Sequence, residues 1–221
     1  MTFDAVDVEQ EPEALKDLER LGIPLVPAVV VGDRVAHGWN PKGVAELVGV
    51  PYFETEHLLP AELTQRLEKI LLAAQHAISQ VPAEHIDMTS PGRDRSVRQL
   101  GYHIFRLCLA FRNGMEEGQY PERWLLEEAP PEITDGAAVA GYGQMVLEQL
   151  TDWLRQPGSW KQVVNTYYGP QTAHELLERT VWHAAQHLRQ IYDFLNRMGL
   201  TPDNPLADAD FTGLPLPKEV W

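Results

Sequence analysis

The sequence predicts a mainly α-helical protein, an up-and-down-type four-helix bundle preceded by a small α/β segment. Between residues 61 and 199, apolar side chains recur at helical spacing in four stretches of roughly 20 residues. The first fifty residues instead alternate short strand-like and short helical patterns. Of the 221 residues, 44% are hydrophobic and 23% are charged, which is ordinary for a globular protein with a packed core.

The charge and the apolar runs exclude several classes of partner. The formal net charge is −14 and no Lys/Arg cluster stands out, so we expect no nucleic-acid partner. The longest apolar run, near 27–31, is far shorter than the roughly 20 residues of a membrane helix. Residues 1–7 lack the features of a signal peptide, and the single cysteine, Cys108, excludes an intramolecular disulfide and a CxxC pair. We therefore expect a cytoplasmic protein with no membrane partner.

The first fifty residues predict strand, helix, strand, strand and helix in that order. A strand is expected over 3–8, a short amphipathic helix over 12–22, a β-hairpin over 26–38 and a closing helix over 41–49. Gly32 and Asp33 supply the turn of the hairpin.

Val26-Pro27, followed by Val31-Gly-Asp-Arg-Val35, resembles the C-terminal part of a glutaredoxin. The resemblance implies a partial thioredoxin-like α/β fragment over residues 1–50, with Pro27 as a cis-proline beside the thiol site. The Cys-Pro-x-Cys half of that family is missing, because the start was lost or because the fragment is now structural. We expect no redox chemistry here and interpret the fragment as a docking or dimerising unit in a homodimer, since an incomplete sheet leaves an exposed edge.

Residues 51–60 form an expected linker bracketed by prolines, and the bundle follows. Its helices are predicted over 61–81, 97–117, 135–156 and 171–199, with Ser96 as an N-cap and Gly199 as a stop. We expect a polar loop at 91–92, an aromatic loop over 157–170, and an extended tail over 200–221 that wraps the surface.

Two histidines in the last predicted helix organise the functional interpretation. His183 and His187 are four residues apart, so they lie one above the other on one helix face. Ile191 and Phe194 continue an overlapping apolar stripe, which turns the histidines toward the interior. His103, on the inner stripe of the second helix, is the best source of a third imidazole. Three neutral imidazoles can hold one metal ion and leave coordination positions open. The alternative is that the rings are interior histidines that bond to their neighbours.

Ser96-Val-Arg-Gln-Leu-Gly-Tyr-His103, followed by His183-x3-His187-x2-Gln190-Ile191, resembles the DinB-like superfamily, also described as the damage-inducible or thiol-dependent S-transferase-like bundle, over about residues 55–200. That family carries one histidine on its second helix and an HxxxH on its last. The resemblance implies a divalent metal held by His103, His183 and His187, with Gln190 near the site. Imidazole ligation suits Zn, Ni, Fe(II) or Cu and does not choose among them.

The remaining candidate residues are assigned structural roles. We expect His174 to cap or face solvent, and His37, His57, His76 and His85 to lie on the surface. Cys108 is 140° round the helix from His103, so it is expected to be a small buried hydrophobe. Glu178 lies five residues before His183 and points elsewhere, so it is not assigned as a base. Among the aromatics, Trp182, Tyr102, Trp160, Tyr167 and Tyr168 are interpreted as packing, with the alternative that the aromatic loop forms a wall over the metal.

Three hypotheses for function follow. By resemblance, the leading one is a metal-dependent enzyme of thiol metabolism, a thiol S-transferase that uses a low-molecular-weight thiol, or a hydrolase that uses the same site on a small-molecule substrate. The second is a non-catalytic stress-related binding protein with a structural metal. The third is a partner-binding N-terminal module with the bundle as its scaffold. The sequence identifies no catalytic residue beyond the ligands.

Overall fold

The computed structural model describes residues 2–8, 11–23, 26–38, 40–52, 57–89, 95–156, 158–217 and 220. The chain divides into two compact units, residues 1–55 and 56–221. The expected loop at 91–92 and the middle of the expected linker, 53–56, lie outside the described residues.

The first unit contains two helices and one hairpin. They are α1 (Pro12–Arg20), β1 (Ala28–Val31), β2 (Arg34–His37) and α2 (Pro41–Val48). The strands pair antiparallel with Val31 opposite Arg34, so Gly32 and Asp33 form the predicted two-residue turn, and Gly32 has φ +63°. The Val26–Pro27 peptide bond is cis, as predicted.

The predicted strand over 3–8 is wrong. Phe3 is 84% exposed and Val6 is 52% exposed, and residues 2–7 carry no regular structure. A strand needs a hydrogen-bonded neighbour, and among the described residues of this unit β1 pairs only with β2. An alternating pattern in the sequence therefore does not make a strand here.

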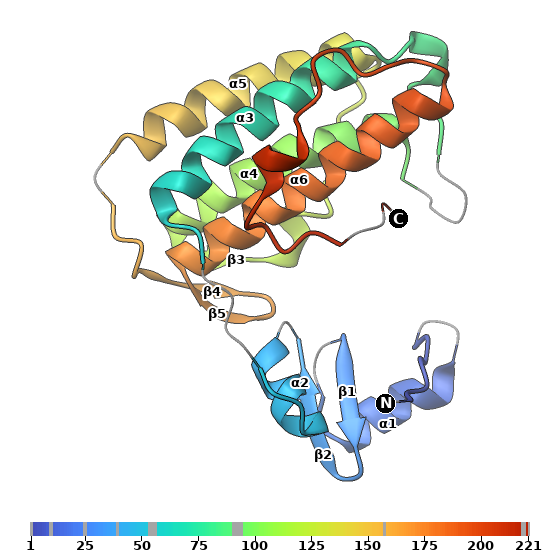
Figure 1. Ribbon diagram of the computed structural model, residues 1–221, viewed down its shortest axis with the longest axis vertical. Helices are drawn as coiled ribbons and strands as arrows, with labels where there is room; N and C mark the ends of the chain where they lie inside the picture. The colour runs from blue at the N-terminus through green and yellow to red at the C-terminus, as the bar shows by residue number, and fades with distance from the viewer. Residues whose placement is uncertain are drawn as a thin grey trace. The chain divides into compact units, whose positions relative to one another are not determined.

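Four long helices of the second unit form the predicted four-helix bundle (Figure 1). They are α3 (Pro60–Ser79), α4 (Val97–Glu117), α5 (Gly136–Leu154) and α6 (Ala173–Arg197). The helices α3 and α4 each pack mainly against α5 and α6, so the order around the bundle is α3, α5, α4, α6. The helices α3 and α4 are thus diagonal, as are α5 and α6, while α4 lies beside both α5 and α6.

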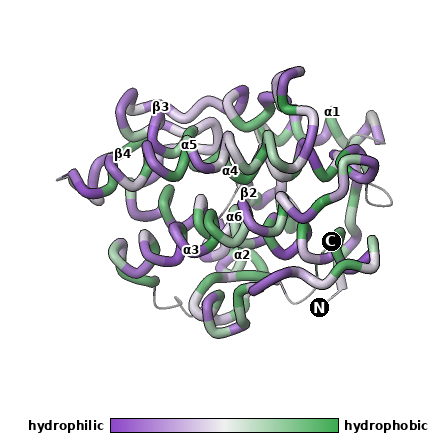
Figure 2. Tube along the Cα trace, turned by 90° about the horizontal axis from the view of Figure 1, so that it is seen from above, coloured by the Kyte–Doolittle hydropathy of each residue, from purple (hydrophilic) through white to green (hydrophobic). Residues whose placement is uncertain are grey.

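The apolar stripes of these helices form one core. Leu67 of α3, Phe105 of α4, Val146 of α5 and Leu188 of α6 are all fully buried. Burying one such side chain contributes about 1.5–3 kcal/mol to the free energy of unfolding. Figure 2 shows hydrophobic and hydrophilic residues alternating along each helix, as expected for helices that bury one face. Among the described residues, no helix combines the length and the apolar character of a membrane span.

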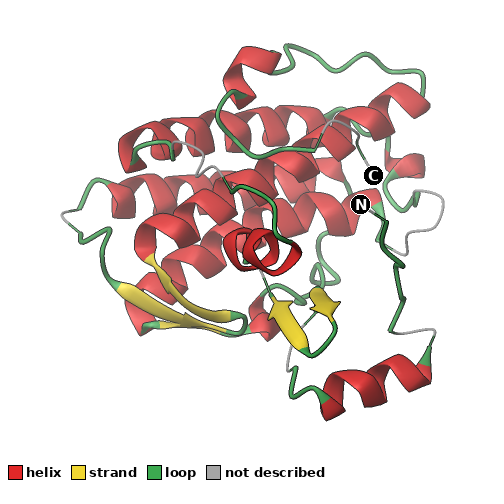
Figure 3. Cartoon of the chain, turned by 60° about the horizontal axis from the view of Figure 1, so that its bottom comes forward, coloured by secondary structure: helices red, strands yellow, loops and turns green. Residues whose placement is uncertain are grey.

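A small sheet lies at one end of the bundle, where the aromatic loop over 157–170 was predicted (Figure 3). It consists of β3 (Gln119–Tyr120), β4 (Val163–Thr166) and β5 (Gly169–Thr172), with β3 parallel to β4 and β4 antiparallel to β5. The prediction of a loop is wrong because these strands gain their hydrogen bonds from each other and from the end of α4. Tyr167 and Tyr168 form the two-residue turn of the β4–β5 hairpin.

The tail after α6 runs over α3 and α6, as expected, and contains one unpredicted 3₁₀ helix, Asp208–Phe211. The Asp210 side chain caps this short helix by accepting from the backbone N–H of Ala207 at 3.1 Å. Arg66 of α3 donates to the backbone oxygen of Asp210 at 2.6 Å. On α6, Trp182 Nε1 donates to the backbone oxygen of Pro215 at 2.7 Å.

Candidate metal centre

The helix α6 begins and ends where local sequence signals place its ends. Thr172 and Glu175 form a capping box, in which the Thr172 side chain accepts from the Glu175 N–H and the Glu175 carboxylate accepts from the Thr172 N–H at 2.7 Å. At the other end, Gly199 follows with φ +76°. This helix presents His183 and His187 one turn apart.

The helix α4 supplies the third histidine. Its N-cap, Ser96, accepts from the backbone N–H of Gln99, and its C-cap, Gly118, has φ +70°. Because α4 buries most of its residues, its inner face carries His103 into the bundle, where this residue is 5% exposed.

The structure brings the three predicted histidines together. The centroid of the His103 ring lies 5.3 Å from that of His183 and 5.1 Å from that of His187, and the centroids of His183 and His187 are 4.6 Å apart. One ring nitrogen from each residue lies within 4.8 Å of the other two. An ion bound at about 2.1 Å by each nitrogen would need separations of at most about 4.2 Å, so small side-chain rotations close the set. His183 and His187 are partly buried as residues, and Nε2 of His187 is itself a buried atom.

A hydrogen bond orients one of the three rings. Nδ1 of His187 lies 2.6 Å from Oε1 of Gln190. An amide oxygen only accepts, so Nδ1 carries the proton and Nε2 keeps its lone pair for an ion. The backbone of Leu125 lies next to His103. Such contacts beyond the ligands are typical of histidine-bound metals.

Burial keeps the imidazoles of His103 and His183 neutral. It lowers the pKa of His103 to about 2, and the positive charge of His187 and of Arg95 acts in the same direction. Burial also lowers the pKa of His183 well below its usual value, with further contributions from His187 and His103. A neutral imidazole is the form that binds a metal. The donor set and its protonation state therefore fit a divalent ion.

A connection after α4 lies along the face that carries His103. The backbone N–H of Ala129 donates to Gln99 Oε1 at 2.9 Å, and Arg106 forms a bidentate ion pair with Glu127. Together with the Leu125 contact, these bonds attach residues 125–129 to Gln99, His103 and Arg106, which are spaced by four and three residues along one helix face. We call residues 125–129 the strap. The strap was not predicted from the sequence, although an arginine in the apolar run of α4, Arg106, was a signal.

The other predicted histidines lie apart from this cluster. His174 is partly buried and its Nε2 lies 2.8 Å from the backbone oxygen of Leu58, so the expected capping or solvent-facing role is wrong. His57 is exposed, as predicted, but it pairs with Glu178 at 2.7 Å. In addition, His37, His76 and His85 are exposed, as predicted.

Cys108 is fully buried, as predicted, and burial raises the pKa of its thiol. Glu178 pairs with His57 and points away from the three histidines, as predicted.

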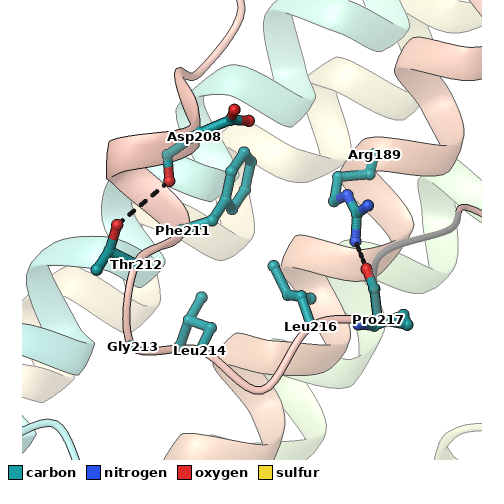
Figure 4. Close-up of a pocket in the computed structure, with 8 residues that line it drawn as sticks. All are labelled: Arg189, Asp208, Phe211, Thr212, Gly213, Leu214, Leu216 and Pro217. Atoms are coloured by element: carbon teal, nitrogen blue, oxygen red, sulfur yellow. Dashed lines mark hydrogen bonds between the residues drawn. The ribbon is translucent and has the colours of Figure 1, made fainter.

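A separate hollow of about 230 Å³ lies between the tail and α6 (Figure 4). Arg189, Asp208 and Phe211 are among its lining residues, and the three histidines are not. Arg189 donates to the backbone oxygen of Pro217 at 2.7 Å across this hollow. The hollow therefore does not belong to the histidine cluster.

The fold and the site define a four-helix bundle with a candidate three-histidine metal centre. The family profile described as the DinB superfamily matches residues 58–191, more than half of the chain. The protein therefore belongs to the DinB superfamily. The match does not extend to residues 1–57, so the glutaredoxin-like interpretation of the first fifty residues stays a prediction.

Among solved structures, the chain is similar to YfiT from Bacillus subtilis, described as a probable metal-dependent hydrolase with an unusual four-helix bundle topology. The two share 21% sequence identity with a TM-score of 0.51, over 69% of this chain and 96% of YfiT. At this identity the likeness establishes the fold alone. No curated protein matches the chain.

Proposed function

We propose that this protein is a metal-dependent enzyme in which His103, His183 and His187 hold one divalent ion and a small molecule is the substrate. The observation that carries the proposal is the convergence of three ring nitrogens within 4.8 Å of one another. Zn, Ni and Fe(II) all suit imidazole ligands, and Zn is the default because it adopts the expected geometry most readily.

The composition of the cluster supports a catalytic over a structural role. Among the described residues, the group comprises three histidines, and no carboxylate or cysteine joins it as a fourth ligand. Structural zinc sites are usually closed by four protein ligands, whereas catalytic sites have three. This favours an enzyme over the alternative of a non-catalytic stress-related binding protein.

The ion would supply Lewis-acid activation of a nucleophile or of a carbonyl group. The chain itself contributes the rest. Gln190 accepts the Nδ1 proton of His187 and so directs Nε2 inward, and the backbone of Leu125 lies next to His103. Burial keeps His103 and His183 unprotonated at neutral pH, so that ligand nitrogens remain available.

We favour hydrolysis as the reaction class, with water as the nucleophile, because the YfiT fold carries a probable metal-dependent hydrolase. Thiol S-transfer is the second candidate, since an ion with imidazole ligands also binds and deprotonates a low-molecular-weight thiol. The two reactions differ in the co-substrate. A hydrolase needs only its ester or amide and water, whereas a transferase requires both the thiol and an electrophile.

We also propose that residues 1–55 form the docking or homodimerising unit. Its sheet has only two strands among the described residues, and Val30 and Val31 of β1 are 44% and 39% exposed. A two-stranded sheet is marginally stable alone and an open strand edge favours pairing. Light scattering of the full chain and of a Val31→Lys variant tests this, and equal masses for a monomer in both would contradict it.

The test of the metal proposal is elemental analysis of the purified chain. We expect about one divalent ion per chain, and its loss in the His183→Ala variant. His76→Ala is the matched control because His76 is exposed on α3. A metal content near zero in the unmodified chain, or an unchanged content in the His183→Ala variant, would contradict the assignment. Removal of the ion with a chelator should abolish turnover of model esters, and added Zn²⁺ should restore it.

A further inference from the structure

An arginine lies on the same face of α6 as the two histidines. Arg179 precedes His183 by four residues and His187 by eight, so it lies one and two helical turns away on that face. Arg179 is partly buried, as are His183 and His187. Its position along α6 therefore places the guanidinium at the edge of the candidate metal centre.

An aromatic ring holds this arginine in place. The Arg179 Cζ atom lies over the ring of Tyr168, 4.3 Å from its centroid. Tyr168 belongs to the turn of the β4–β5 hairpin. A contact with the face of a ring positions the guanidinium and does not require its five N–H donors. The β4–β5 hairpin is thus connected to the edge of the candidate metal centre by the contact between Tyr168 and Arg179.

The carboxylates nearest to Arg179 in the sequence bond elsewhere. Glu175 accepts from the backbone N–H and the hydroxyl of Thr172, both at 2.7 Å. Glu178 pairs with His57 at 2.7 Å. Within the described part of the chain, Arg179 forms no ion pair and no hydrogen bond. This is informative in a chain with 32 acidic and 18 basic residues, because many acidic groups are available to neutralise it.

Other arginines of the bundle do form ion pairs with carboxylates. Arg106 pairs with Glu127, Arg112 pairs with Glu116 at 3.0 Å and Arg197 pairs with Asp193 at 2.7 Å. Arg179 is partly buried, lies over an aromatic ring and has no carboxylate partner among the described residues. A planar guanidinium in this state matches a carboxylate or a phosphate group, which it binds through two parallel hydrogen bonds.

We infer that Arg179 binds the oxyanion of a small anionic substrate, a carboxylate or phosphate group, while the reacting part of that substrate lies at the three-histidine centre. This rests on the proposed function, because it assigns a substrate class to the same site. Three neutral ligands leave the charge of a divalent ion uncompensated, so the site as a whole favours an anion. Tyr168 is then a positioning residue for Arg179.

The experiment measures binding of two probes, succinate and inorganic phosphate, to the zinc-loaded full chain by isothermal titration calorimetry. We expect at least one probe to bind, and its affinity to fall about tenfold or more in the Arg179→Gln variant, as for loss of a charged hydrogen-bond partner. Tighter binding of succinate indicates a carboxylate substrate, and tighter binding of phosphate indicates a phosphorylated one. Arg155→Gln is the matched control, since Arg155 is exposed beyond the end of α5.

Equal affinities in the unmodified chain and in the Arg179→Gln variant, or no binding of either probe to the unmodified chain, would overturn the inference. Metal content is measured on the same samples, so a failure of the metal site is distinguished from a failure of Arg179. If the Arg179→Gln variant does not fold, Arg179→Lys keeps the charge but loses the bidentate geometry, and should weaken probe binding several-fold. Tyr168→Leu should weaken it without changing the metal content.

Discussion

The hydrogen bond between Gln190 and His187 supports a quantitative prediction. Replacing Gln190 by alanine removes the acceptor that lies 2.6 Å from Nδ1 of His187. The imidazole then loses its preferred tautomer and orientation, while all three ligand residues remain. Loss of such a contact typically weakens metal binding 10- to 100-fold, which corresponds to about 1.4–2.7 kcal/mol.

The Gln190→Glu substitution should have the opposite effect on metal affinity. A carboxylate at this position still accepts the Nδ1 proton and raises the basicity of the ring, so zinc affinity should equal or exceed that of the unmodified chain. The assay is competition for Zn²⁺ between the protein and a chromophoric chelator near neutral pH. Gln156→Ala serves as a control because Gln156 is exposed and lies after the end of α5.

An orienting role of Gln190 is refuted if Gln190→Ala binds zinc as tightly as the control. It is also refuted if Gln190→Ala and Gln190→Glu weaken binding equally, since that pattern would indicate a packing role for Gln190. Thermal unfolding of the metal-free variants separates the two cases, because an orienting role leaves the melting temperature nearly unchanged.

Two further predictions concern stability. In α5, Gly136→Ala should destabilise the fold by about 2 kcal/mol or more, because the added Cβ would lie 2.2 Å from the backbone oxygen of Ile78. By contrast, the Cβ of Gly141→Ala meets open space, so this substitution should stabilise the fold by about 0.5–1 kcal/mol. Urea denaturation checks the pair, and a Gly136→Ala variant as stable as Gly141→Ala would contradict the contact. The hydrogen bond from Arg106 lowers the pKa of Glu127 below its usual 4.5. The ionised carboxylate therefore stabilises the fold above pH 4.5, and this stabilisation is lost as the pH falls through the pKa of Glu127 in the folded state. Glu127→Gln should therefore lose about 1 kcal/mol at neutral pH and show a shallower acid dependence, and parallel acid titrations of both proteins would argue against this.

The parts of the fold that follow from local signals were predictable. Thr172 and Glu175 mark the start of α6 and Gly199 its end, so the helix could be placed from the sequence. The four-residue spacing of His183 and His187 then put both on one face. The third ligand, His103, required the further step that two apolar stripes pack together, which the bundle architecture supplies.

The parts that depend on non-local hydrogen bonds were not predictable. The strand β4 pairs in parallel with β3, which precedes it by more than forty residues, and no short-range pattern indicates that pairing. The strap approaches His103 through the backbone of Leu125, and a backbone contact leaves no mark on the residue type. The availability of Arg179 depends on where Glu175 and Glu178 bond, which only the folded chain determines.

The spacing of the ligands along the chain has a consequence for synthesis. His103 leaves the ribosome 80 residues before His183, and α5 and the β4–β5 hairpin are made in the interval (103 to 183). A nascent chain that ends before α6 holds a single imidazole of the set and cannot retain an ion. Loading of the proposed metal would therefore wait until translation has passed His187, and the bundle would have to reach that point without help from the cation.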